Sequence, residues 1–452
     1  MASKDALMPL TYLRDDFFAQ FGRYWPRNQD LARAVSQTRM ETYGPEPLPP
    51  RLEMVELPPW AQDLGIAGKI AIPAHLKPDG NDWRIIDWPL VGAWFLHCLA
   101  ERAHEQLHGP IHSNAWRLKG WSPLLWRYAW ANRIALFLRR WAAVASGRDE
   151  DTVFGPLPET KILLTHDVDA VSKTWPIRLK QSAFHIFNAL RLLRRGQGKQ
   201  ALQRLNAWRA FMLRGSQDWG LEKMAALDAE HELAAYFLFA GARAPGLFTE
   251  PRRWLLDPGY DSVELAPTLQ KLLAEGHTIG LHPSYEHWRD AQALEDAKKY
   301  LETALGGEKV RCCRQHWLRF SFAHTWAAQH EAGFTNDFTL GFNNRPGFRN
   351  GAALAITPFA GSQPMRRLEG LAAWPLVLMD SQLYDYDLEA GQLQNFSVID
   401  EIMGEVNAVR GQATVLWHPH TLSCDYGWEA GCLALLRALK SFRAENPAHD
   451  QI

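Results

Sequence analysis

Short β-rich runs alternate with helical stretches over residues 161–418, and this alternation constrains the fold more than any other feature of the chain. Seven runs have the composition of buried strands: 161–167, 234–240, 277–282, 310–316, 334–341, 376–383 and 413–418. Strands separated by helices are typical of a parallel sheet built from βα units. We therefore expect an α/β protein whose parallel strands close into a barrel.

Polar side chains stand at the carboxyl ends of most of these runs. They are Asp167, Asp169, His282, Arg314, His316, Asp337, Asp380, His418 and His420. In a closed parallel barrel the strand ends surround one mouth, so residues far apart in the chain meet there. Carboxylates, several histidines and an arginine at these ends are more than the packing of a core requires.

The segment KILLTHDVDA, residues 161–170, contains the most informative of these ends. Its apolar run breaks into Asp167 and Asp169, which point the same way on an extended chain. Converging carboxylates repel each other unless a proton or a cation lies between them. The plain alternative is a capping loop, because Asp is common between a strand and a helix.

The chain has 452 residues, which is long for one average domain. We expect an α-rich accessory region over 1–158, with a packing or substrate-framing role, and a catalytic barrel over 159–445. Lys and Arg total 49 against 50 for Asp and Glu, so no overall positive field attracts nucleic acid. Nucleic-acid binding is therefore not expected.

Cysteine usage and hydropathy predict the compartment. Five cysteines without CxxC spacing argue against a disulfide framework and fit a reducing environment. The chain reaches Arg14 before any long apolar run, unlike a secretory signal. Its most apolar window, 88–100, is too short to cross a bilayer. We expect a cytoplasmic protein.

A basic stretch follows the Asp167/Asp169 segment. Between Asp169 and Asp218 there is no acidic residue, while ten Lys or Arg residues interleave with apolar ones over 173–214. This pattern is typical of a basic amphipathic helix. The plain interpretation is a barrel helix with a solvated basic face. The sharper hypothesis is a lid or a peripheral contact with the inner membrane face that presents a lipid-linked or phosphate-bearing glycan.

Four segments carry a resemblance to a known family: LTHDVD from Leu164, GHTIGLHPSY from Gly276, RQHWLRF from Arg314 and VLWHPH from Val415. In this order, each at a predicted strand end, they resemble the motifs of the polysaccharide deacetylase family. That family consists of metal-dependent carbohydrate N-deacetylases and esterases on a distorted seven-stranded (β/α) barrel. The resemblance leaves the N-terminal third of the chain unexplained.

The resemblance implies a role for each matching residue. Asp167 would be the general base, Asp169 and His282 metal ligands, Arg314 the group that orients the base, and His418 the general acid. The implied cofactor is a divalent metal ion, with zinc expected. Such an ion lowers the pKa of a bound water, and an imidazole suits proton donation near neutral pH.

The chain departs from the family pattern at the second histidine, which typically follows the first by four residues. Glu286 stands at that position and His287 one residue further. We expect His287 to complete the metal site, with Glu286, His316 and His420 as open alternatives. Five residues are expected to contact substrate: His316, Trp317, Asp337, Arg349 and Trp417.

The expected function is removal of an N-acetyl group from an amino sugar of a glycan or glycan precursor. The same chemistry would also serve a deformylase or an O-deacetylase, because all three reactions hydrolyse an acyl group with an activated water. From a different class, a carbohydrate-binding protein on an inactive barrel remains the alternative.

Overall fold

The computed structural model describes residues 9–36, 38–42, 44–80, 82–213, 219–361, 366–384 and 396–445. Its centre is a curled, eight-stranded sheet in the order β10-β7-β6-β5-β4-β3-β12-β11, in which every neighbouring pair is parallel. The strands are β3 (Lys161–Asp167), β4 (Ala235–Phe239), β5 (Thr278–Leu281), β6 (Cys312–Cys313), β7 (Asn336–Asp337), β10 (Ala372–Ala373), β11 (Leu376–Met379) and β12 (Gln412–Leu416).

The strand count differs from the expected seven because one stretch of chain is split into β10 and β11. Pro375, between them, has no N–H to donate to a ladder. Before the break β10 pairs with β7, and after it β11 pairs with β12. Leu376 still donates its N–H to the carbonyl of Leu340, just beyond β7, at 2.8 Å. This stretch thus joins the two edges of the sheet into a distorted barrel.

Alternate residues of the strands face the barrel interior, as a period of two requires. Leu163, Leu238 and Cys312 pack together inside, whereas neighbours such as Leu164 and Phe237 join the larger core under the helices. Gly280 fits here because a Cβ at this position would lie 2.2 Å from a Leu238 methyl carbon. By the same alternation, Asp167 belongs to the inward-facing set of β3.

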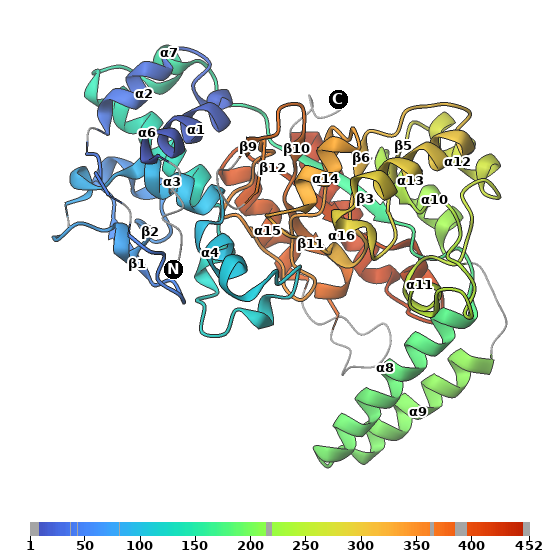
Figure 1. Ribbon diagram of the computed structural model, residues 1–452. Coiled ribbons are helices and arrows are strands. Elements are labelled where there is room, and N and C mark those ends of the chain that lie inside the picture. The colour runs from blue at the N-terminus through green and yellow to red at the C-terminus, as the bar shows by residue number, and fades with distance from the viewer. Residues whose placement is uncertain are drawn as a thin grey trace, which may run out of the picture.

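Helices follow the strands, and all of them except the α8–α9 pair lie around the barrel (Figure 1). They are α8 (Trp175–Arg194), α9 (Gly198–Leu213), α10 (Leu221–Glu230), α11 (Pro251–Leu256), α12 (Ala266–Ala274), α13 (Ala291–Ala304), α14 (Thr325–Glu331), α15 (Ser397–Ala408) and α16 (Glu429–Glu445). The start of α13 is fixed by Asp290, whose carboxylate accepts the N–H of Ala293 at 3.0 Å. None of the described helices combines the length and the apolar composition of a bilayer-spanning segment.

The N-terminal third is rich in helices and shares one continuous core with the barrel. Its elements are α1 (Leu10–Gln20), α2 (Gln29–Val35), β1 (Leu52–Glu56), β2 (Lys69–Pro73), α3 (Trp88–Leu96), α4 (Leu99–His108), α5 (Leu124–Arg127), α6 (Trp130–Ala145) and α7 (Glu150–Phe154). Strands β1 and β2 form an antiparallel pair. Asn132 on α6 both donates to and accepts from the backbone of Ala353 at 2.9 Å. The boundary at residue 158 stays a prediction.

Two short strands, β8 (Phe359–Ala360) and β9 (Arg366–Arg367), form a separate antiparallel pair. Helices α8 and α9 pack against each other as a hairpin that extends away from the body of the molecule (Figure 1). In the sequence the hairpin lies between β3 and β4, so it starts close to the carboxyl end of β3.

Candidate active site

Asp167, the last residue of β3, is buried and bonded to Arg314. The guanidinium of Arg314 donates from Nη1 to Asp167 Oδ1 at 2.8 Å, and from Nε to the carbonyl of Phe338 at 2.8 Å. Both side chains are almost without solvent contact. The cation therefore fixes the orientation of the carboxylate and leaves Oδ2 without a hydrogen bond among the described residues.

Three side chains, from the segments that follow β3, β5 and β6, converge next to this pair. One ligand-type atom each of Asp169, His282 and His316 lies within 4.8 Å of the others. Asp169 Oδ1 lies 3.2 Å from His282 Nε2 and 3.8 Å from His316 Nδ1. One carboxylate and two imidazoles are a donor set suited to zinc and related divalent ions.

The protonation of these groups fits a bound cation. His282 donates from Nδ1 to the carbonyl of Arg314 at 2.8 Å, which leaves Nε2 facing Asp169. Burial lowers the pKa of His316 to about 4, so its imidazole is neutral. Burial raises the pKa of Asp169, but the imidazoles of His282, His316 and His418 outweigh it and hold that pKa well below its usual range. Asp169 is therefore ionised.

The hydrogen bonding of these side chains is also consistent with a metal-binding group. Asp169 Oδ1 and both ring nitrogens of His316 are buried without a hydrogen-bond partner among the described residues. Orphaned polar atoms of this kind are rare in folded proteins.

Burial lowers the pKa of His282, but the charges of Asp167 and Asp169 raise it above its usual value. The two carboxylates thus stabilise a positive charge at this point.

His418 and Asp380 form a second paired unit at the site. His418 follows β12. Its Nδ1 donates a hydrogen bond to Asp380 Oδ1 at 3.0 Å. Its backbone N–H donates to the other oxygen, Oδ2, at 2.8 Å. The outward nitrogen, Nε2, lies 3.7 Å from Asp169 Oδ2. Burial lowers the pKa of His418, but the charge and hydrogen bond of Asp380 raise it to about 10, so the ring is protonated at neutral pH.

Tyr260 holds the turn between the two aspartates. Its hydroxyl donates to the carbonyl of Val168 at 2.6 Å and accepts the N–H of Ala240 at 2.9 Å. The N–H of Val168 in turn donates to the carbonyl of Leu238 at 2.9 Å. Burial raises the pKa of Tyr260, so its hydroxyl keeps its proton. Asp167 and Asp169 therefore stand on a fixed backbone.

The N-terminal third contributes anchors to the segment that carries His316. Ser113 donates from Oγ to the carbonyl of Trp317 at 3.1 Å. The carboxylate of Glu105 accepts the N–H groups of Phe322 and Ala323 at 3.1 Å each. Residues of the accessory region thus hold the rim of the barrel in place.

The structure does not bring His287 into the metal group, so the expectation that it completes the set is corrected. His287 lies in a short 3₁₀ helix, His287–Arg289, beside Asp257 and Arg253. Glu286 is ion-paired with Arg252 at 3.0 Å and with Arg319 at 3.1 Å. The place of a second histidine is taken instead by His316, from the segment after the neighbouring strand β6.

Asp337 and Trp417 are also corrected as substrate contacts. Asp337 is buried and accepts hydrogen bonds from Trp326 at 2.9 Å and from Gln329 at 2.8 Å. Its carboxylate is thus occupied within the barrel wall. Trp417 has no solvent exposure and its ring packs against Tyr384 in the helix layer. Neither side chain can reach a ligand in the mouth.

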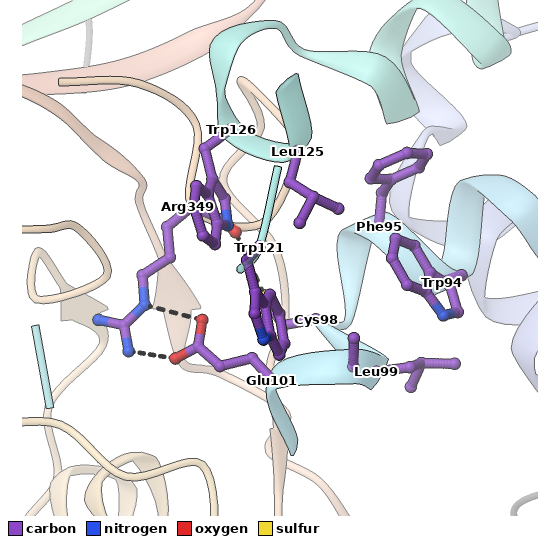
Figure 2. A pocket seen from close by; sticks show the side chains of 11 residues that line it. Trp94, Phe95, Cys98, Leu99, Glu101, Trp121, Leu125, Trp126 and Arg349 are labelled. Atoms are coloured by element: carbon purple, nitrogen blue, oxygen red, sulfur yellow. Dashed lines mark hydrogen bonds and ion pairs between the residues drawn. The ribbon is translucent and has the colours of Figure 1, made fainter. Parts of the chain in front are cut away.

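Arg349 is a structural ion pair, not a substrate clamp. Its Nε donates to Glu101 Oε2 at 3.3 Å, and its Nη2 bonds to the other oxygen of the same carboxylate. Figure 2 shows the two side chains facing each other at the edge of a small cavity lined by Trp121 and Trp126. Glu101 belongs to α4, so this buried pair joins the accessory region to the barrel.

Trp317 lies exposed beside the converging side chains, and its role as a substrate contact stays a prediction. Its side chain is 49% exposed and adjoins His316, whose ring it stacks against at 6.4 Å. Its backbone is left-handed, with φ of 57°, a costly conformation for a bulky residue. The hydrogen bonds to its carbonyl from Ser113 and Asn343 maintain it.

Three further residues at the site have roles that the sequence did not indicate. Asp380 orients His418, and Tyr260 holds the backbone between the two aspartates. Lys180 on α8 counted only as part of the basic run, yet it lies within electrostatic reach of Asp169 and Asp257, and burial lowers its pKa. The pairing of β11 with β12 is the signal that would have placed Asp380 beside His418.

A cavity of about 310 Å³ lies between the segments that follow β4 and β5. Its wall includes Asp257, Ser284 and His287. Asp257 accepts a hydrogen bond from Ser284 at 2.5 Å and from the N–H of Tyr285 at 2.8 Å. The volume is in the range of small-molecule sites, and Ser284 is separated by one residue from His282.

Comparison with known proteins gave no matching family model and no matching curated protein. Among solved structures, the chain is similar to a protein assigned as a polysaccharide deacetylase from Mycobacterium smegmatis, with 19% identity, a TM-score of 0.34, and coverage of 65% of this chain and 87% of that one. It is also similar to polysaccharide deacetylase Bc1974 from Bacillus cereus, with 12% identity, a TM-score of 0.28, and coverage of 63% and 88%.

A third similar structure is the catalytic domain of a peptidoglycan N-acetylglucosamine deacetylase from Eubacterium rectale. It shares 9% identity with a TM-score of 0.28, over 66% of this chain and 88% of that one.

Proposed function

We propose that this protein is a metal-dependent hydrolase that removes an N-acetyl group from an amino sugar of a glycan or glycan precursor. One observation carries the proposal. Asp169, His282 and His316 converge on one point, while Asp167 and His418, each fixed by a partner of its own, stand next to that point. The resemblance of the LTHDVD and VLWHPH segments to deacetylase motifs supports the same chemistry.

Asp169, His282 and His316 would hold the metal ion, with zinc the expected species. When bound, a divalent ion in such a set acidifies water and polarises a carbonyl oxygen. Asp169 supplies the negative charge, and the neutral His316 supplies an imidazole with free ring nitrogens. The bond from His282 Nδ1 to the Arg314 carbonyl fixes the tautomer in which Nε2 is the ligand.

Asp167 is the general base in this scheme. Arg314 holds Oδ1 and leaves Oδ2 to accept a proton from the water that attacks the acetamide carbonyl. Because Arg314 is itself anchored to the Phe338 carbonyl, the carboxylate cannot rotate away. A base positioned this way contributes about 10²–10⁴-fold to a rate.

His418 is the general acid. It is protonated at neutral pH because of Asp380, and its Nε2 faces the site. When the C–N bond breaks, His418 gives its proton to the departing amine, which would otherwise be a poor leaving group. Asp167 and His418 thus take opposite roles although both lie beside Asp169.

The substrate side of the site has one exposed aromatic face and one cation. Trp317 offers a ring on which a sugar can stack, and Lys180 stands near Asp169. We propose an amino-sugar glycan as the substrate class for this reason. A lipid-linked substrate and a cytoplasmic location remain predictions.

The test combines metal analysis with acetate release from an N-acetylated amino-sugar oligosaccharide. The purified protein is expected to hold about one metal ion per chain and to release acetate. Asp167→Asn is expected to retain the metal and to lose activity by about 10²-fold or more. Arg127→Gln, an exposed change on α5 away from the site, is the matched control and should keep full activity.

Two results would overturn the proposal. Absence of both metal and acetate release from N-acetylated and O-acetylated sugars would indicate a carbohydrate-binding protein. Full activity of Asp167→Asn would show that the base lies elsewhere.

A further inference from the structure

The α8–α9 hairpin carries a row of exposed apolar side chains. Along α8 they recur with helical spacing: Trp175, Leu179, Ile186, Phe187, Leu190 and Leu193 are all exposed, and Leu202 on α9 adds to them. Residues at these intervals lie on one face of a helix. Trp175 and Phe187 are 65% and 63% exposed, far more than large apolar residues that serve a core.

Packing within the hairpin does not account for this face. The two helices are joined by a small cluster of Ala189, Leu192 and Ala201, against which Leu205 packs. Ala189 and Leu192 are buried in this contact, whereas Leu190 and Leu193 remain exposed, so the contact with α9 leaves the exposed row uncovered. The exposed face is therefore available to a partner.

The charge of the hairpin is of one sign. No Asp or Glu occurs between Asp169 and Asp218. Near the turn between the helices, Arg194, Arg195 and Lys199 are all exposed and lie next to the exposed Leu190 and Leu193. Apolar residues flanked by cations, without any acidic group, match the interface of an anionic bilayer.

We propose that the α8–α9 hairpin docks this protein on an anionic lipid bilayer, with the apolar row of α8 inserted between the headgroups and the cations on lipid phosphates. A second copy of the chain is a poorer occupant, because pairing of two identical basic faces brings like charges together. The hairpin extends away from the body of the molecule (Figure 1), so a planar surface can reach it.

Docking would also place the bilayer near the active site. Helix α8 begins at Trp175, shortly after Asp169, and Lys180 on the same helix lies within electrostatic reach of Asp169. A substrate at the membrane surface would therefore approach the mouth of the barrel along α8. The docking itself does not depend on hydrolysis, so its failure would leave the proposed deacetylase activity intact.

The experiment is co-sedimentation of the full chain with vesicles of phosphatidylcholine alone or with phosphatidylglycerol added, at low salt. Binding is expected only to the anionic vesicles. Arg194→Gln combined with Arg195→Gln is expected to weaken it about 30-fold, since each cation near such a surface contributes about fivefold. Leu190→Ser with Leu193→Ser, which removes apolar insertion but no charge, is expected to weaken it about tenfold or more.

Matched controls separate this site from general charge and hydrophobicity. Arg311→Gln with Arg437→Gln removes two exposed cations elsewhere, and Leu107→Ser removes an exposed leucine of α4; both should bind as the parent does. Equal binding to neutral vesicles, or unchanged binding by both hairpin variants, overturns the proposal. Self-association without vesicles that the Leu190→Ser and Leu193→Ser pair abolishes would assign the face to a second copy and also overturn it.

Discussion

Asp380 binds His418 twice, once through the imidazole Nδ1 at 3.0 Å and once through the backbone N–H at 2.8 Å. The carboxylate therefore sets both the ring orientation of His418 and its charge. Burial of His418 opposes the charge, but Asp380 outweighs it and the pKa rises to about 10. Asp380 itself lies at the end of the neighbouring strand, β11, and has almost no solvent contact.

Asp380→Asn is expected to move the alkaline limb of the pH–rate profile to lower pH. A general acid must carry its proton, so activity falls as the pH rises through the pKa of His418. Removal of the Asp380 charge lowers that pKa, by about one to three pH units for a charge at this distance. The measurement is kcat as a function of pH for both proteins.

The pair of His418 and Asp380 also makes the folding stability depend on pH. The folded pKa of His418 lies above its ordinary value of 6.5, so this stabilisation is fully present below pH 6.5 and is lost as the pH rises towards about 10.

An alkaline limb of the pH–rate profile that stays in place in Asp380→Asn would show that His418 is not the proton donor.

His316→Ala is expected to remove the metal, whereas His287→Ala is expected to leave it bound. The reason is position: an imidazole nitrogen of His316 lies 3.8 Å from Asp169 Oδ1, while His287 lies outside this group. Loss of a direct ligand should weaken metal binding by more than the 10–100-fold typical of outer-shell changes. Metal content after dialysis against a weak chelator distinguishes the two variants, and the opposite order would restore His287 as the ligand.

Trp317→Ala is expected to raise KM several-fold with a smaller change in kcat. An aromatic face that stacks on a sugar binds the substrate and the transition state alike, so its loss weakens binding more than it slows chemistry. Trp116→Ala is the matched control, because Trp116 is also largely exposed but lies in the accessory region. Initial rates over a range of oligosaccharide concentrations provide both constants, and an unchanged KM would exclude the stacking role.

Glu101→Gln is expected to destabilise the fold by about 3–5 kcal/mol, because it leaves the buried Arg349 cation without its partner. The free energy of unfolding from denaturant titration measures this cost. At a temperature where the variant stays folded, KM should match the parent, since the ion pair lies between α4 and the barrel. A raised KM with unchanged stability would instead return Arg349 to the substrate site.

The sequence predicted the strands best where apolar residues form an uninterrupted run. The strand expected over 161–167 coincides with β3 (Lys161–Asp167). Those expected over 310–316 and 334–341 shrink to two residues each. In the first of these segments the later positions, Arg314, Gln315 and His316, carry polar side chains, and the left-handed backbone at Trp317 ends the extended chain. There the strand ends where the polar side chains of the site begin.

The candidate site was predictable only in part, because some of its pairings are non-local. Asp167, Asp169 and His282 stand at ends of strands that alternate clearly in the sequence. The proximity of His316 depends on β5 and β6 being neighbours, whereas the family spacing after His282 pointed to Glu286 and the adjacent His287. The sequence also does not show which of the remaining candidates are buried. Asp337 is hydrogen-bonded inside the barrel wall, and Trp417 is buried in the helix layer.

Glu105 and Ser113 belong to the first third of the chain, yet their hydrogen bonds hold the segment that carries His316 and Trp317. A barrel expressed without residues 1–158 would lose these tethers along with part of its core. During evolution, exchange of the leading region for another module would therefore succeed only if the newcomer supplied equivalent acceptors and donors. In this protein the accessory region and the rim of the barrel have to be inherited together.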